Sequence, residues 1–371
     1  MHRPVLAALL AALAFALAGA PSAFAGGHGR KVVFVQTNGP GGNAIVVFDR
    51  AHDGTLTQAG TYPTGGVGGT AAPGTESDHL ASQGSLAYDA GDRVLVAVNA
   101  GSDSVSAFRV HGDRLSLVDV VSSGGQFPAS VAIRDDLVYV LNSGGSGTVA
   151  GFRLDHGALI PLPGSVRSLG LANATPPNFL TSPGQVGFSP DGGQLLVTTK
   201  ASTSSIDVFQ VLADGRLSAT PVANASATPV PFALTFSPFG RLVAGEAGAS
   251  SLTTYALQHD GTVTGPQSAT DGQTALCWVQ RVGPYYFVSN TGSNTLSSFW
   301  LAPDGQPVLL NAVAAAAPAG PIDLAASDGF LYAETGLAGT VQEYAVQADG
   351  SLASIGSVTG LPAGIEGIAA T

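Results

Sequence analysis

The chain has 371 residues, of which 50 are glycine, and only 11% are Asp, Glu, Lys or Arg. Acidic residues outnumber basic ones by 25 to 14, which gives a net charge of −11. Nucleic acid and anionic membranes repel such a chain, so we expect neither as a partner. The single cysteine, Cys277, excludes an intrachain disulfide, and its apolar neighbours predict a buried, unreactive thiol.

Residues 1–25 have the pattern of a cleaved export signal. A positive charge near the start is followed by an apolar stretch over 5–17 and by a small-x-small cleavage site at 23–25. The apolar stretch is too short to span a bilayer, so we expect no membrane insertion. We therefore predict a signal peptide over 1–25, cleaved after Ala25, one domain over 26–371, and a secreted or periplasmic protein.

A short pattern, an apolar residue followed three positions later by an aromatic one, recurs seven times along the rest of the chain. The aromatic residues are separated by 60, 44, 57, 46, 44 and 45 positions. A unit of about 45 residues built from short strands is typical of propeller blades. The seven pairs are Ile45 and Phe48, Val105 and Phe108, Val149 and Phe152, Ile206 and Phe209, Leu252 and Tyr255, Leu296 and Phe299, and Val341 and Tyr344.

Each repeat divides into four predicted strands, which in the second repeat cover 84–89, 94–99, 104–110 and 115–121. A turn follows each aromatic position, and in five repeats it contains Asp-Gly, a strong hairpin signal because both positions tolerate positive φ. Two connections, 65–82 and 170–182, are unusually long. Both join the outer strand of one blade to the inner strand of the next, so both are expected on the face around the channel mouth.

The two ends of the domain together supply one blade. The segment 26–53 has 28 residues and 22 follow Asp349, and 364–370 has the pattern of the innermost strand that the first blade lacks. We therefore predict an all-β, monomeric seven-bladed β-propeller with four-stranded antiparallel blades, in which the C-terminal strand completes the first blade and closes the ring.

Three phrases carry a family resemblance: Phe-Ser-Pro-Asp-Gly at 188–192, Leu-Thr-Phe-Ser-Pro at 234–238, and the blade phrase at 98–105. The chain resembles the seven-bladed lactonase-like propellers, which include 6-phosphogluconolactonases and 3-carboxymuconate lactonising enzymes. The resemblance covers essentially all of 26–371. It implies hydrolysis or formation of a small lactone at the channel mouth.

The site positions of that family are not retained in this chain. Its Gly-Pro-Arg-His run corresponds to Ser-Pro-Gly-Gln at 182–185, so that glycine and Gln185 replace Arg and His. Its Asn-Glu pair corresponds to Lys200-Ala201, and its Asn-Arg pair to Glu246-Ala247. The resemblance therefore does not supply a general acid or base or a carboxylate-binding arginine at these places.

The second strand of each predicted blade ends on the mouth face. Asparagine suits such an end because its side chain bonds its own backbone and tolerates left-handed φ. Lys200, Glu246 and Glu334 depart from that pattern, and Lys200 with Glu246 could form an ion pair or supply a cation and a general base. The seven end positions are Asn38, Asn99, Asn142, Lys200, Glu246, Asn290 and Glu334.

His79 is the one histidine in a long mouth-face connection, where it is a polar loop residue, a general base or a metal ligand. Gln83 and Gln185 enter inner strands and could contribute amide groups to a ligand. Nothing has the spacing of a metal site, so we expect neither metal nor cofactor.

Two hypotheses follow. In the first, the protein is an enzyme that acts on a small lactone or carboxylate. Its catalytic groups would be Lys200, Glu246 and His79, and its ligand-binding residues would be Gln185, Gln83, Asn142, Asn99, Asn290 and Glu334. In the second, it is a catalytically silent propeller that binds a small ligand or a protein partner in the cell envelope.

Overall fold

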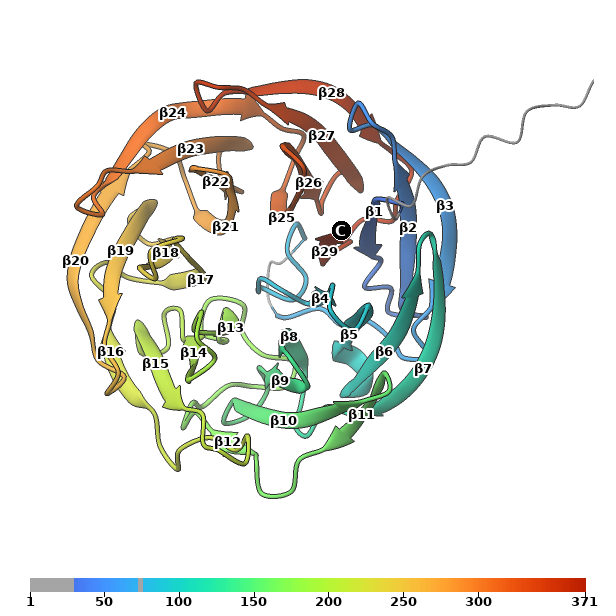
Figure 1. Cartoon of the computed structure of the whole chain (residues 1–371), viewed down its shortest axis with the longest axis vertical. Coiled ribbons are helices and arrows are strands. Elements are labelled where there is room, and N and C mark those ends of the chain that lie inside the picture. Colours follow the sequence, from blue (N-terminus) through green and yellow to red (C-terminus); the bar gives the residue numbers. More distant parts are fainter. Residues whose placement is uncertain (1–29, 73–75) are drawn as a thin grey trace, which may run out of the picture.

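The structure is a computed structural model that describes residues 30–72 and 76–371. The predicted signal peptide lies outside these residues. The described chain forms a ring of seven blades around a central channel, as Figure 1 shows, with one short 3-10 helix, η1 (Ala100–Ser102). The predicted seven-bladed β-propeller is therefore confirmed.

The blades are antiparallel sheets, each with its innermost strand along the channel. From the channel outward, blade 1 contains β29 (Ile368–Ala370), β1 (Val32–Gln36), β2 (Ala44–Arg50) and β3 (Leu56–Pro63). In the same direction, blade 2 contains β4 (Leu86–Asp89), β5 (Val94–Asn99), β6 (Ser104–His111) and β7 (Arg114–Ser122). Blade 3 contains β8 (Pro128–Arg134), β9 (Leu137–Asn142) and β10 (Thr148–Asp155), and its outer strand is divided into β11 (Ala158–Pro161) and β12 (Arg167–Ser168).

The other four blades follow the same plan. Blade 4 contains β13 (Gln185–Phe188), β14 (Gln194–Thr198), β15 (Ser205–Gln210) and β16 (Val222–Ala225). Blade 5 contains β17 (Pro231–Phe236), β18 (Leu242–Glu246), β19 (Ser251–Leu257) and β20 (Val263–Thr270). Blade 6 contains β21 (Leu276–Val282), β22 (Tyr285–Asn290), β23 (Thr295–Leu301) and β24 (Pro307–Ala316), and blade 7 contains β25 (Pro321–Ser327), β26 (Phe330–Thr335), β27 (Thr340–Val346) and β28 (Leu352–Val358).

The seven repeated apolar–aromatic pairs all lie on the third strand of their blade. Both members of every pair are buried, from Ile45 and Phe48 on β2 to Val341 and Tyr344 on β27. Their side chains belong to apolar clusters that fill the spaces between neighbouring blades. The repeat detected in the sequence is therefore the packing unit that holds one blade against the next.

The Asp-Gly turns differ from the expected geometry. Only the glycine has positive φ, for example +90° at Gly54 and +91° at Gly261. The aspartate carboxylate instead accepts a hydrogen bond from the backbone amide two residues later, as Asp53 does from Thr55. The hairpins form where predicted, but the aspartate stabilises them through its side chain.

The ring closes as predicted, because β29 pairs with β1 and completes blade 1. Val33, Phe34 and Val35 lie opposite Ala370, Ala369 and Ile368. Figure 1 shows the blue N-terminal strands beside the red C-terminal one. Without this pairing β1 would face the channel as an open edge.

Ring closure gives a stability prediction. Ile368 is 5% exposed and packs in the cluster that joins blades 7 and 1, so Ile368→Ala should lower the unfolding free energy by about 2–4 kcal/mol. Denaturant unfolding followed by circular dichroism measures this change. Ile160→Ala is the matched control, because Ile160 is 48% exposed. Equal losses in both variants would contradict the role of β29.

Candidate functional site at the channel mouth

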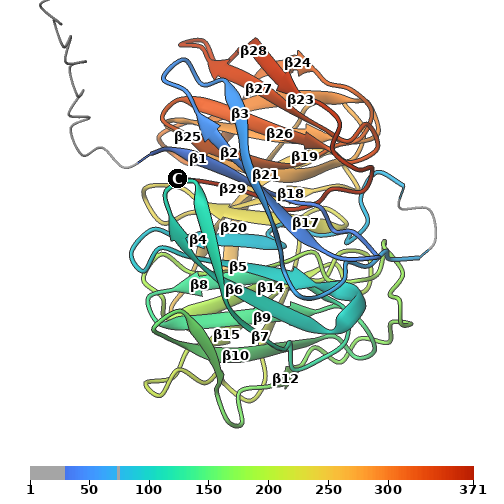
Figure 2. The same cartoon turned by 90° about the vertical axis from the view of Figure 1, so that its right-hand side faces the viewer.

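The two long connections meet on one face of the ring, as predicted. Ala72 and Asn178 form an isolated parallel bridge, in which the Ala72 amide donates to the Pro177 carbonyl and the Phe179 amide donates to Ala72. Figure 2 shows both connections on the same side of the ring. The mouth is therefore covered by chain segments that do not belong to the repeated blades.

Lys200 fastens these two connections to each other. Its ammonium donates to the carbonyls of Ala81 and Phe179, both at 2.5 Å, and to Ser182 Oγ at 2.9 Å. The side chain is 1% exposed and its Nζ lies 5.1 Å from the centre of the Phe232 ring. An ammonium has three donors, so no donor of Lys200 remains for a ligand.

The segment 76–83 then crosses the channel. The Gln83 amide donates to the Val279 carbonyl at 3.1 Å and accepts from the Val279 amide at 3.0 Å. The Trp278 indole donates to the Ser82 carbonyl. Figure 1 shows the light-blue chain before β4 inside the ring. This crossing separates the mouth from the rest of the channel.

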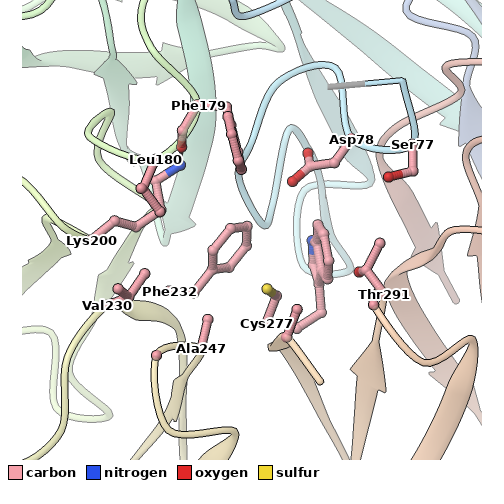
Figure 3. Close-up of a pocket in the computed structure, with 14 residues that line it drawn as sticks. Ser77, Asp78, Phe179, Leu180, Lys200, Val230, Phe232, Ala247, Cys277 and Thr291 are labelled. Carbon is pink, nitrogen blue, oxygen red and sulfur yellow. Dashed lines mark hydrogen bonds between the residues drawn. The ribbon is translucent and has the colours of Figure 1, made fainter. Parts of the chain in front are cut away.

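Above the crossing lies a pocket of about 450 Å³, within the range of small-ligand sites. Aromatic side chains from three parts of the chain surround it, and Figure 3 shows the Asp78 carboxyl facing the space between Phe179 and Phe232. Most of the lining is apolar. The lining residues are Ser77, Asp78, Phe179, Leu180, Lys200, Val230, Phe232, Ala247, Gly248, Ala275, Cys277, Trp278, Thr291 and Gly292.

Asp78 is 8% exposed and is paired with a second carboxyl group, that of Glu366. The Ala81 amide donates to Asp78 Oδ1 and the Leu80 amide donates to Glu366 Oε2. Among the described residues, no backbone amide or hydroxyl donates to Glu366 Oε1. Two carboxyl groups can hydrogen bond only when one is protonated, so this pair shares a proton.

Electrostatics decide which member keeps that proton. Burial raises the pKa of Glu366 well above its usual range, and the charge of Asp78 raises it further. Burial also raises the pKa of Asp78, but the hydrogen bond from Glu366 and the charge of Lys200 oppose that rise. Glu366 is therefore the protonated member, and Asp78 is the member able to ionise and accept a proton.

Two further acids, Asp323 and Glu334, are buried in the same part of the ring. Burial raises the pKa of Asp323 to about 7. Burial and the charge of Asp323 raise the pKa of Glu334 well above its usual range. The Glu334 carboxylate accepts from the Gly367 amide. Glu334 therefore stays protonated at neutral pH, whereas Asp323 ionises near pH 7, because burial makes the charged form of both groups costly.

Of the predicted catalytic residues, only Lys200 lines the pocket. Glu246 is fully buried elsewhere in blade 5, where Thr228, Thr253 and Tyr255 donate to its carboxylate. No ion pair between Lys200 and Glu246 forms within 30–72 and 76–371. The four hydroxyl groups around Glu246, including that of Ser251, hold its side chain in place instead.

His79 lies next to Asp78 in the chain but does not line the pocket. Its ring is half-buried against Gly364, and its Nδ1 has no hydrogen-bond partner among the described residues. Burial lowers the pKa of His79, so the imidazole is neutral at neutral pH. Gly364 has φ +84°, and a side chain there would collide with the imidazole.

The predicted ligand-binding residues are held by the protein itself. Gln83 bonds Val279, and Gln185 Oε1 accepts from the Leu234 amide. The Asn99 and Asn290 amides donate to hydroxyls of their own blades, and that of Asn142 donates to the Ser123 carbonyl. The structure brings none of these residues, nor Glu334, into the lining of the pocket.

Sequence reasoning missed Asp78, Glu366 and Asp323 as functional candidates. Glu366 and Asp323 each interrupt an apolar inner strand segment, 364–370 and 321–325. A carboxyl group in such a segment breaks the apolar pattern of a buried strand. The sequence alone could therefore have marked both residues as candidates. Cys277 is buried as predicted, and burial raises the pKa of its thiol, so it is a poor nucleophile.

Within the described part of the chain, no three His, Cys, Asp or Glu side chains are grouped so as to hold a metal ion. No helix found there has the length and apolar character needed to cross a bilayer.

The fold and the pocket define this chain as a seven-bladed propeller with a ligand-sized pocket at one mouth of its channel. A family model described as Lactonase, 7-bladed beta-propeller, matches residues 41–167, which confirms the predicted resemblance to lactonase-like propellers. No curated protein matches the chain in sequence.

Several solved structures share the whole architecture. A Lactobacillus plantarum protein is 19% identical, with 92% of this chain and 99% of that one covered and a TM-score of 0.72. A periplasmic gluconolactonase from Pseudomonas aeruginosa is 19% identical, with 91% and 98% covered and a TM-score of 0.70. A Bacteroides fragilis protein, named provisionally as a 6-phosphogluconolactonase, is 17% identical, with 93% and 98% covered and a TM-score of 0.70. At these identities the likeness establishes the fold.

The role of Lys200 gives a second stability prediction. Lys200→Met keeps much of the side-chain volume but leaves three acceptors, two of them buried, without their donor. This should cost about 1–3 kcal/mol for each buried acceptor. Thermal and denaturant unfolding measure the loss. Lys31→Met is the matched control, since the Lys31 side chain is 42% exposed. A Lys200→Met protein as stable as this control would show that the lysine does not hold the connections.

The pKa of Asp323 predicts a pH dependence of stability. Between about pH 4, where an unfolded aspartate ionises, and about pH 7, where folded Asp323 does, the folded state holds a proton that the unfolded state has lost. The unfolding free energy should therefore fall as pH rises through this window, by up to about 1.4 kcal/mol per pH unit for each such group.

In Asp323→Asn the unfolding free energy should fall less steeply as pH rises. The part of the fall that remains would come from Glu334 and Glu366. Urea unfolding between pH 4.5 and 7.5 is the measurement, with Asp92→Asn at an exposed turn as control. Parallel pH profiles for the parent and Asp323→Asn would refute the assignment.

Proposed function

We propose that the protein binds a small, largely apolar lactone in the mouth pocket and hydrolyses it, with Asp78 as the general base. The observation that carries this proposal is a carboxyl group, 8% exposed, that faces a largely apolar pocket of ligand size. The lactonase-type family match and the names of two structural neighbours support the reaction class.

In the proposed reaction, Asp78 takes a proton from a water molecule as the water oxygen attacks the lactone carbonyl carbon. The bond between that carbon and the ring oxygen then breaks. The ring oxygen takes a proton back, and the product is a hydroxy acid. General base catalysis of this kind contributes about 10²–10⁴-fold to a rate.

Glu366 and Lys200 are positioning residues in this scheme. Protonated Glu366 hydrogen bonds Asp78 and keeps its basic oxygen oriented, while the charge of Lys200 favours the ionised form of Asp78. Lys200 acts through its field alone, because its three donors are occupied by Ala81, Phe179 and Ser182.

The occupied donors of Lys200 limit the class of substrate that the pocket can bind. A phosphorylated sugar lactone needs donors for its phosphate, and within 30–72 and 76–371 Lys200 is the one cation that lines the pocket. Phe179, Phe232 and Trp278 favour a ligand with an apolar body. We therefore propose uncharged aliphatic or aromatic lactones as the substrate class.

We further propose that the protein is exported, on the basis of the signal-peptide pattern over 1–25. Cell fractionation of the expressed full chain, with N-terminal sequencing of the product, tests both export and cleavage after Ala25.

Hydrolysis measured by pH-stat on a panel of uncharged and phosphorylated lactones tests the function. The parent should favour the uncharged members, and Asp78→Asn should lower kcat/KM by at least about 100-fold because the proton acceptor is lost. Glu366→Gln keeps a donor to Asp78 and should retain most of the activity. Asp92→Asn, far from the pocket, is the control.

A second candidate is a binding propeller without catalysis. It is favoured by the backbone amides of Ala247, Gly248 and Gly292, which all donate to carbonyls, so none of these three amides is available to an oxyanion. Lactone binding by calorimetry with no turnover in the parent would select this candidate. Turnover unaffected by Asp78→Asn would contradict the base.

A further inference from the structure

The channel contains a second cavity on the far side of the crossing segment. It measures about 650 Å³ and is open toward the face opposite the mouth. Residues from the inner strands of blades 2 to 6, which are β4, β8, β13, β17 and β21, line it. The layer formed by Gln83 and Val279 lies between this cavity and the mouth pocket.

Two arginines stand at its opening. Arg134 ends β8 and Arg281 is the penultimate residue of β21. Blades 4 and 5 separate these strands, and Figure 1 shows β8 and β21 on different sides of the channel. Gln280 adds an amide. In a chain with net charge −11, the described lining contains no Asp or Glu.

Both guanidinium groups keep unused donors. Arg281 donates to the Gly283 carbonyl through one nitrogen, and no other hydrogen bond of its guanidinium is found within the described residues. Arg134 donates to the Pro190 carbonyl, and its Nε lies 3.7 Å from an oxygen of Asp135. A guanidinium has five N–H donors in a planar fork that matches a carboxylate.

The nearby acids do not neutralise this opening. The Asp135 side chain is 87% exposed and points into solvent, where its field is screened. The Asp191 carboxylate is already occupied by the Ser189 hydroxyl and the Gly193 amide. The arginines therefore remain the main charges at the cavity.

The wall of this cavity combines polar groups, among them Gln185 and Thr235, with apolar side chains. Val131 and Ile133 from β8, and Leu234 and Phe236 from β17, are part of the lining. A ligand that suits the cavity has two negative ends for the arginines and a short middle that can pack against these apolar side chains. We propose that this opening of the channel binds a small aliphatic dicarboxylate, with Arg134 and Arg281 each taking one carboxylate.

This site is independent of the proposed lactone chemistry, because it shares no lining residue with the mouth pocket. Isothermal titration of the full chain with adipate at low ionic strength is the direct test. Adipate should bind with one site per chain, and hexanoate, which has one carboxylate, should bind at least about tenfold more weakly, since a charge-assisted contact is lost.

Variants then locate the site. Arg281→Gln and Arg134→Gln should each weaken adipate binding by at least about tenfold. Arg114→Gln, at an exposed hairpin, makes the same charge change and should have no effect. Asp78→Asn should also leave adipate binding unchanged, which separates this site from the mouth pocket.

Three results would overturn the proposal. They are no adipate binding at millimolar concentration, binding that Arg281→Gln does not weaken, and inorganic phosphate binding as tightly as adipate. The last would show a single-anion site rather than one spanned by a dicarboxylate. Circular dichroism of each variant confirms that the fold is intact.

Discussion

The ammonium of Lys200 is the interaction on which the mouth of this propeller depends. It joins Ala81, Phe179 and Ser182, which come from two connections far apart in the sequence. Neither connection belongs to a sheet, so neither has a ladder of backbone hydrogen bonds to hold it. One buried charge with three acceptors replaces that ladder. The pocket exists because this lysine fixes the segments that line it.

A buried cation is stabilised by negative charge nearby, and two carboxyl groups lie close to Lys200. Asp78 and Glu366 lie close enough to Lys200 to influence its pKa, yet they share a proton rather than both ionising. Burial, the largest influence, lowers the pKa of Lys200 to about 8. The result is a buried ammonium that has one ionisable carboxyl group and one protonated carboxyl group near it. That arrangement suits proton transfer at the pocket.

The crossing segment 76–83 also divides the channel into two chemically different cavities. The mouth side is apolar, with one carboxyl and an occupied lysine, whereas the opposite side has two arginines with unused donors. Gln83 forms the division by pairing with the Val279 backbone as a strand would. The two proposed ligands would therefore bind at opposite ends of one channel without contacting each other.

The sequence by itself determined the propeller, its seven blades and its closure by the C-terminal strand. Those features depend on local periodicity, and each blade repeats the same buried pair, such as Ile45 and Phe48 on β2. The tertiary structure decided the site. Leu80 contacts Glu366 across a sequence separation of 286 residues, and Gln83 contacts Val279 across a separation of 196 residues. Such contacts leave no periodic signal, because they are made by the segments that depart from the repeat. For the same reason Glu246, predicted beside Lys200, is held within its own blade.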